Sequence, residues 1–197
     1  GSDNVVNESG DSLVAWNWLA GGSASSNSDG DITSSVSANT TAGFSIGTFT
    51  KGSGTQTVGH GLGKKPTMFW VKRTDGTGSW YVYHDKNTDA PETDYLRINS
   101  TDGTADNSTV WGDTAPTSSV FSISTAFNSS EELIFYAFTD IKGYSKFGSY
   151  TGNGNDDGAF IYTGFKPAWV MTRQTNGANY FHIHDNKRNT FNVVGKF

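Results

Sequence analysis

Short runs of alternating apolar residues dominate this sequence and limit the folds open to it. Each run carries apolar side chains at alternate or consecutive positions and is bounded by Gly, Asn, Asp or Pro; the runs span residues 13–18, 67–72, 79–84, 120–123 and 133–138. A strand repeats its pattern every second residue, whereas an amphipathic helix repeats at three and four. Strong helix formers are scarce, and the chain contains only four Glu. The pattern predicts an all-β fold and excludes a helical bundle or a doubly wound α/β enzyme.

Two dipeptides mark turns between such runs. Asp75-Gly76 and Asn176-Gly177 each lie between two apolar segments. Both dipeptides tolerate the positive φ angles that close a tight hairpin. The sequence therefore predicts a tight β-hairpin at each of the two sites.

The chain repeats itself at an offset of 100 to 101 residues. Residues 65–85 correspond to residues 166–185, with Lys-Pro near the start and His-Asp at the end of each, and Gly43-Phe44-Ser45 returns as Gly143-Tyr144-Ser145. Similarity at a fixed offset indicates one structural unit that occurs twice. The run at 13–18 also resembles the run at 133–138, which suggests a strand that covers an open sheet edge.

These repeats predict β-sandwich-like modules in tandem, the second of them incomplete. The expected divisions are an N-terminal strand with a Gly/Ser/Asn-rich linker (1–42), a first β-sandwich repeat (43–142) and a partial second repeat (143–197). The linker assignment rests on the Gly, Ser, Asn and Asp content of residues 21–42.

Charge and composition narrow the range of partners. The formal net charge is −5, and Lys and Arg are mostly scattered singly, so the sequence predicts no nucleic-acid partner. No stretch approaches the roughly 18 apolar residues of a membrane span, and none is predicted. The absence of cysteine excludes disulfides and a Cys nucleophile. Aromatic residues make up 14% of the chain, enough to build a packed core.

Several stretches resemble a repeated β-rich domain of marine bacteriophage tail-fibre and adhesin-like structural proteins. They read GFSI (43–46), TVGHGLG (57–63), WYVYH (80–84), TAPTSSVF (114–121) and GYSKFGSYTGNG (143–154). The resemblance extends over nearly all of residues 12–195. It implies a β-sandwich-like module on the virion, in an extracellular setting, with a role in host attachment and no catalytic residues to carry over.

Two glycine-containing motifs resemble catalytic or phosphate-binding signatures but lack the required context. Residues 43–47 match G-x-S-x-G, yet a strand and a turn follow where a nucleophile elbow needs a helix. Residues 59–65 fit neither the dinucleotide fingerprint nor the Walker loop, and no helix is predicted after them. We expect a strand followed by a turn at the first motif, and a glycine turn that leads into the strand after Pro66 at the second.

Carbohydrate binding is the chemistry that the aromatic residues suggest. An exposed ring stacks on the apolar face of a sugar, and neighbouring polar groups fix its hydroxyls. The candidate residues are Trp80, Tyr83, His84, Asp85, Trp111, Tyr180, His184 and Asp185. Because adjacent strand residues face opposite ways, only part of this set can be exposed. The alternative is that these aromatics pack in the core.

Metal binding is a second interpretation of the second hairpin. On a strand, His182 and His184 share one face, and three copies around a fibre axis would offer six imidazoles to a divalent transition metal. The alternative is two surface imidazoles beside Ile183. Residues 27–31 and 153–158 offer oxygens to calcium, with ordinary turns as the alternative. No other cofactor is expected.

Together these features predict a non-enzymatic phage virion module that attaches to a host-surface glycan or serves as a fibre spacer. The expected partners are a host glycan and other virion proteins, in a homo-oligomer for which a trimer is one option. The alternative is a capsid-decorating or other self-associating virion structural protein. A glycosidase needs two carboxylates about 5–10 Å apart, and neither the four Glu nor any Asp pair stands out as such a couple.

Overall fold

The protein, described in a computed structural model over residues 9–10 and 13–187, is almost entirely β, which confirms the predicted fold class. In the described residues the helical structure is a single short α2 (Ser108–Trp111). The strands are β1 (Ser25–Asn27), β2 (Ser34–Asn39), β3 (Phe44–Thr50), β4 (Gln56–Gly59), β5 (Met68–Arg73), β6 (Trp80–His84), β7 (Asp94–Arg97), β8 (Ala105–Asp106), β9 (Val120–Ile123), β10 (Glu132–Phe138), β11 (Trp169–Thr172) and β12 (His182–Asp185). No helix in this part of the chain has the length or apolar composition to cross a bilayer.

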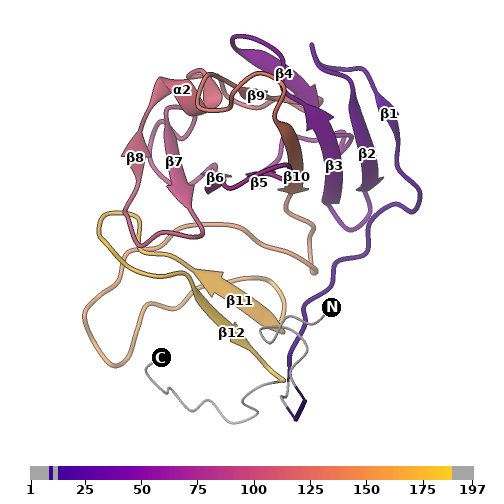
Figure 1. The fold of residues 1–197 in the computed structure, drawn as a ribbon. Coiled ribbons are helices and arrows are strands. Elements are labelled where there is room, and N and C mark those ends of the chain that lie inside the picture. Colours follow the sequence, from indigo (N-terminus) through magenta and orange to yellow (C-terminus); the bar gives the residue numbers. More distant parts are fainter. Residues whose placement is uncertain (1–8, 11–12, 188–197) are drawn as a thin grey trace.

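One large antiparallel sheet organises the chain. Its strand order is β1-β2-β3-β10-β5-β6-β7-β8, with β10 between β3 and β5. Two smaller sheets pair β4 with β9 and β11 with β12. Figure 1 shows the large sheet curling, with β4, β9 and α2 at its top and the β11–β12 hairpin below it.

The main core lies between the inner face of the curled sheet and the layer made by β4, β9 and α2. Rings from both layers meet there: Phe69 of β5 lies 4.7 Å from Phe121 of β9 and 4.9 Å from Trp111 of α2, measured between ring centroids. All three side chains are buried. This two-layer packing makes the fold sandwich-like.

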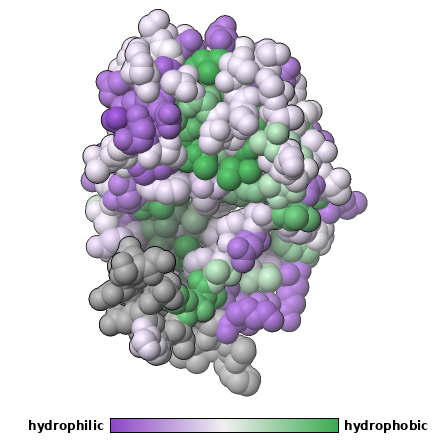
Figure 2. All heavy atoms as spheres, turned by 45° about the vertical axis from the view of Figure 1, so that its right-hand side comes forward, coloured by the Kyte–Doolittle hydropathy of each residue, from purple (hydrophilic) through white to green (hydrophobic). Residues whose placement is uncertain are grey.

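A second cluster covers part of the opposite, outer face of the sheet. Phe44, Met68 and Phe138 form its buried centre. Residues from outside the sheet pack on it, among them Phe147 and, from the second hairpin, Met171 and Phe181. Figure 2 shows hydrophobic residues at several places on one face of the molecule, between more hydrophilic ones.

Residues 25–39, which were predicted to belong to a linker, form β1 and β2 of the large sheet. The linker prediction is wrong for them because buried serine hydroxyls of β2 donate hydrogen bonds to backbone carbonyls of neighbouring segments. Ser34 Oγ donates to the Gly59 carbonyl (2.8 Å) and Ser37 Oγ to the Gly22 carbonyl (2.7 Å), while Val36 enters the main core. In this segment the polar composition is that of a linker although the residues form strands.

Residues 13–18 were predicted to be a strand, and the structure contains none there. Leu13 is 64% exposed, so the alternating pattern does not correspond to a buried face. Trp18 instead lies edge-on to Trp169, the first residue of β11, at 5.6 Å, and also contacts Phe138. The segment thus lies beside the second hairpin through a ring contact and not through strand pairing.

Both predicted hairpins form, as β5–β6 and β11–β12, but their turns are not tight. Neither Gly76 nor Gly177 has a positive φ. Gly76 instead leaves room for the folded-back Arg73 side chain, because a Cβ there would lie 2.9 Å from its Cζ. The two hairpins also differ in register, since Met68 pairs with His84 while Trp169 pairs with Asp185. The boundaries at residues 42 and 142 stay predictions.

Candidate functional site

The strand register aligns side chains of the outer face in rows that cross the large sheet. The first row runs from β1 to β6 as Ser26, Ser35, Thr48, Ile134, Lys72 and Trp80. The second row, two residues further along each strand, runs from β2 to β7 as Ser37, Ile46, Tyr136, Trp70, Val82 and Leu96. Strands separated by about 4.8 Å make the first row a strip about 24 Å long.

Three aromatic rings meet where these rows cross β10, β5 and β6, and we call Trp70, Trp80 and Tyr136 the aromatic patch. The Trp80 and Tyr136 rings are stacked at 6.1 Å, with 27° between their planes, and Trp70 lies 6.1 Å from Tyr136. All three are half-buried. The Trp70 indole Nε1 has no hydrogen-bond partner among the described residues. Exposed ring surface of this kind can stack on a sugar or another flat apolar group.

Hydroxyl groups occupy the other end of the first row. Ser26, Ser35 and Thr48 are exposed, and together with Thr50 and Glu132 they help to line an open cleft of about 510 Å³. Glu132 is the acidic side chain in the cleft lining. The outer face therefore joins an aromatic end to a hydroxyl-rich end, with Glu132 at the cleft.

The second hairpin closes the remaining part of the outer face. It is fixed to the first sheet through the 101–104 loop, where Asn179 N donates to the Thr101 carbonyl and Thr104 N to the Thr175 carbonyl, both at 2.8 Å. Arg173 also lies over the Phe181 ring at 5.0 Å. Met171 and Phe181 of the hairpin pack on the cluster that contains Val82, whereas among residues 9–10 and 13–187 nothing packs in this way on the exposed side chains of the first row.

Two of the predicted carbohydrate-binding residues lie in the core, so the prediction is wrong for them. Trp111 and Tyr83 are each 1% exposed. Trp111 donates its indole N–H to the Asp94 carbonyl (3.0 Å), and the Tyr83 ring stacks on Phe69 at 4.8 Å. Tyr83 points inward because it alternates with outward-facing residues on β6. A surface ligand cannot reach either ring.

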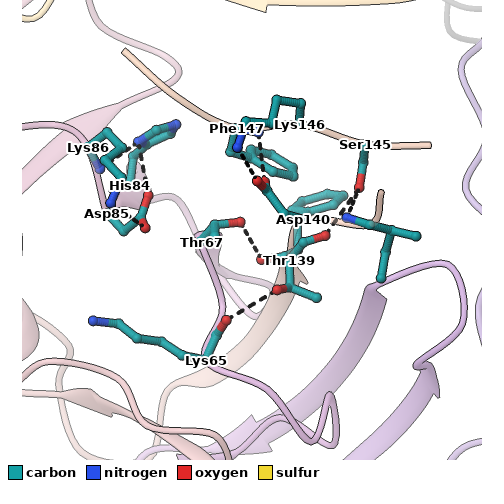
Figure 3. A network of polar contacts seen from close by, with 12 residues as sticks. Lys65, Thr67, His84, Asp85, Lys86, Thr139, Asp140, Ser145, Lys146 and Phe147 are labelled. Carbon is teal, nitrogen blue, oxygen red and sulfur yellow. Dashed lines mark hydrogen bonds and ion pairs between the residues drawn. The ribbon is translucent and has the colours of Figure 1, made fainter. Parts of the chain in front are cut away.

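His84 and Asp85 lie at the far end of β6 from Trp80, in the polar network drawn in Figure 3. The Lys86 backbone N–H donates to His84 Nδ1 (3.0 Å), and Lys86 Nζ pairs with Asp85 at 3.1 Å. Burial lowers the pKa of His84, although the nearby Asp85 carboxylate opposes this shift. Four residues of strand, about 13 Å, separate His84 from Trp80. The predicted set therefore does not converge on one site.

The network in Figure 3 also fixes the segment that follows β10. Asp140 accepts from the Phe147 backbone N–H (2.8 Å) and pairs with Lys146 at 2.7 Å. The Asp140 carboxylate raises the pKa of Lys146. Ser145 Oγ donates to the Thr139 carbonyl (3.2 Å). These bonds hold Phe147 against the second cluster and indicate a structural role.

Three of the four predicted residues of the second hairpin are exposed on one side of β12 and its preceding loop. Tyr180 is 71% exposed, His182 and His184 share the exposed side of β12, and Asp185 is half-buried. His182 Nε2 lies 3.1 Å from Asn179 Oδ1. In residues 9–10 and 13–187, no three His, Cys, Asp or Glu side chains come together as a metal site. A site built from several copies stays a prediction.

Side-chain oxygens of the two predicted calcium loops accept hydrogen bonds from other residues of the protein. Asp31 accepts from the Thr57 backbone N–H (2.9 Å) and hydroxyl (2.8 Å), and these bonds hold the pKa of Asp31 below its ordinary value. Asn153 accepts from the Asn155 N–H (3.1 Å). The Asn153 bond is typical of an Asx turn, whereas the Asp31 bonds join two segments that are 26 residues apart in the sequence.

Sequence reasoning found Trp80 and missed Trp70 and Tyr136. Both were contained in predicted strands, and both share strand parity with neighbours on the outer face. Parity alone could have grouped Trp70 with Lys72 and Tyr136 with Ile134. It could not show that β10 lies beside β5, which is what brings the two rings together.

Ser45 and His60, from the two glycine-containing motifs, are both fully buried. Ser45 Oγ donates to the His60 carbonyl (2.5 Å), and β3 continues to Thr50 without a helix. The His60 ring accepts from the Leu62 N–H (3.2 Å) at Nδ1 and lies 3.3 Å from the Thr117 carbonyl at Nε2. Both residues therefore connect β3 to the loop after β4.

Acid should destabilise the protein through His60. Burial lowers the pKa of His60 below its ordinary 6.5, so in the folded state it binds a proton less readily than in the unfolded state. The contribution of neutral, buried His60 to the free energy of unfolding is therefore fully present above pH 6.5. It is lost as the pH falls from 6.5 towards the folded-state pKa. Urea midpoints measured from pH 7.5 to 5 should show this fall, and His60→Gln should reduce its slope. His84→Gln should remove a further part, and an unchanged slope in both variants would contradict the assignment.

The fold and this face define the molecule as an all-β, sandwich-like domain with an open aromatic and hydroxyl-bearing sheet surface. The chain belongs to the family described as Domain of unknown function (DUF7483), which matches over residues 1–197. Neither a curated protein nor a solved structure matches the sequence.

Proposed function

We propose that this domain is a non-enzymatic module on the exterior of a phage particle and attaches to host-surface carbohydrate through the outer face of its large sheet. The observation that carries the binding role is the aromatic patch, with Trp80 stacked on Tyr136, on the same face as the exposed hydroxyl of Thr48. Aromatic faces and hydroxyl partners are what sugar recognition requires. The phage context rests on the sequence resemblance described above.

The acid–base groups near this face favour binding over catalysis. Lys72 Nζ donates to the Arg73 carbonyl (2.7 Å), which holds the ammonium at the edge of the patch. Glu132 lies on β10 at the cleft, where its Cα partner on β3 is Thr50. A glycosidase would need a second carboxylate about 5–10 Å from Glu132. The cleft lining carries hydroxyls beside Glu132, and the Asp75 carboxylate, which lies near the Glu132 backbone N–H, is paired with Arg73 at 2.6 Å.

A glycan array tests the proposal. The wild-type protein should bind, and Trp80→Ala and Tyr136→Ala should each weaken binding roughly tenfold, as expected if one stacked ring contributes about 1.4 kcal/mol. Tyr162→Ala is the matched control, because Tyr162 is 80% exposed and distant in sequence from the patch strands. Loss of binding in Tyr180→Ala alone would place the site on the second hairpin. Absence of binding together with self-association by solution mass would favour a decorating protein.

A further inference from the structure

We infer that the ligand of this face is a linear, uncharged polysaccharide that lies across the strands, from Trp80 on β6 to Ser26 on β1. The inference rests on the proposed function and adds the direction, length and charge of the ligand. It follows from which row of the outer face is open.

The direction follows from the cover provided by the second hairpin. Met171 and Phe181 pack on the cluster that contains Val82 and Leu96, so the second row is closed at its β6–β7 end. Within the described part of the chain the first row carries no such cover, since Ser26, Ser35 and Thr48 are exposed and Trp80 is half-buried. A chain in contact with both ends of the open row must therefore cross the strands.

The length follows from the strand spacing. Five steps of about 4.8 Å make the row about 24 Å long, which several sugar rings of an extended chain would occupy. The aromatic patch would stack one ring at the β5–β6 end. The hydroxyls of Thr48 and Ser35 would bond rings towards β1, where the cleft of about 510 Å³ opens. A single sugar would leave most of these groups unused.

The charge follows from the balance of ionisable groups. Lys72 in the row and Glu132 beside it carry opposite charges, and the whole chain carries −5. A polyanionic chain would be repelled by that net charge and would meet only one nearby cation on the row. The part of the strip from β1 to β3 carries hydroxyls in place of the apolar centre that a protein partner would need. An uncharged, hydroxyl-rich chain matches the surface.

Oligosaccharide ladders test the inference. The probes are cello-, malto- and laminari-oligosaccharides from disaccharide to octasaccharide, with alginate oligosaccharides as the anionic ladder, and affinity is measured by titration calorimetry. One neutral ladder should bind with an affinity that rises over several added units and then levels off. An equal affinity from the disaccharide upward, or preference for alginate, would overturn the inference.

Variants separate the two ends of the strip. Trp80→Ala should weaken every member of the ladder, whereas Thr48→Val should leave the disaccharide unchanged and weaken the long members roughly fivefold, the loss expected for one hydrogen bond. Thr151→Val, at an exposed loop position, is the matched control. An unchanged affinity of Thr48→Val for long members would overturn the inference while the proposed function stands. If no ladder binds and the array is also empty, the proposed function itself fails.

Discussion

Replacing Trp111 by Ala is expected to lower the free energy of unfolding by about 3–5 kcal/mol, the usual loss for a large buried aromatic. Trp111 is 1% exposed and contacts three rings from other parts of the fold, those of Phe69 on β5, Tyr83 on β6 and Phe127 after β9. Its indole N–H also satisfies the Asp94 carbonyl at 3.0 Å. Removing it would open a cavity between the two layers and leave a buried acceptor unpaired.

Two further variants show how much of this stability loss comes from the hydrogen bond and how much from burial of the ring. Trp111→Phe keeps an aromatic ring but loses the bond to Asp94, so it should fall between the wild type and Trp111→Ala. Trp80→Ala removes the same side chain from a half-buried position and should cost less than Trp111→Ala in urea unfolding. A stability loss for Trp111→Ala below that of Trp80→Ala would contradict the core position. Carbohydrate affinity per folded molecule should be unchanged in Trp111→Ala, because the ring lies on the inner side of the sheet.

Substituting Gly47 by Ala should destabilise the protein by about 1–3 kcal/mol or more, as overpacking of a filled core does. Gly47 lies in β3 opposite Phe135, and a Cβ there would lie 2.5 Å from Phe135 Cε1 and 3.0 Å from the Ser35 carbonyl oxygen. Phe135 is fully buried and packs against Phe49 and Phe121, so its ring has no free space to enter. The Phe135 ring therefore occupies the space that a side chain at position 47 would need.

The matched control is Gly148→Ala, since nothing lies within 4 Å of a Cβ at Gly148 and its φ is not positive. That variant should change the urea midpoint little. Adding Phe135→Leu to Gly47→Ala should recover part of the loss, because a smaller side chain vacates the contested space. Equal midpoints for Gly47→Ala and Gly148→Ala would contradict the close approach of β3 and the Phe135 ring.

Alternation along the chain predicted β5, β6, β9 and β10 close to their observed bounds, because each places large apolar side chains on a buried face. It failed for β1 and β2, where serine hydroxyls replace apolar side chains and bond the backbone directly. It also failed at residues 13–18, whose apolar residues meet a ring of β11 and pair with no strand. Alternation of apolar residues therefore predicts a buried strand only where the buried side chains are apolar.

The candidate site was harder to predict than the fold because it depends on which strands are neighbours. Trp111 resembled a surface aromatic beside Asp113, yet α2 directs it into the core, since a single helical turn carries no strand parity. The aromatic patch combines Trp70 and Tyr136, which lie far apart in the sequence and meet only through the β10–β5 pairing. Sequence indicated the right residue types, and topology decided which of them share a surface.

The central place of β10 has a consequence for how the chain folds during synthesis. Strands β3 and β5 are both made well before β10, and each gains its second neighbour only when residues 132–138 arrive. Until then a nascent chain presents two unpaired inner edges, which invite pairing with other chains. Closure depends on contacts between distant parts of the sequence, so it is expected to be slow relative to local hairpin formation. A ribosome-bound chain that ends before Glu132 should therefore be the most aggregation-prone intermediate of this protein.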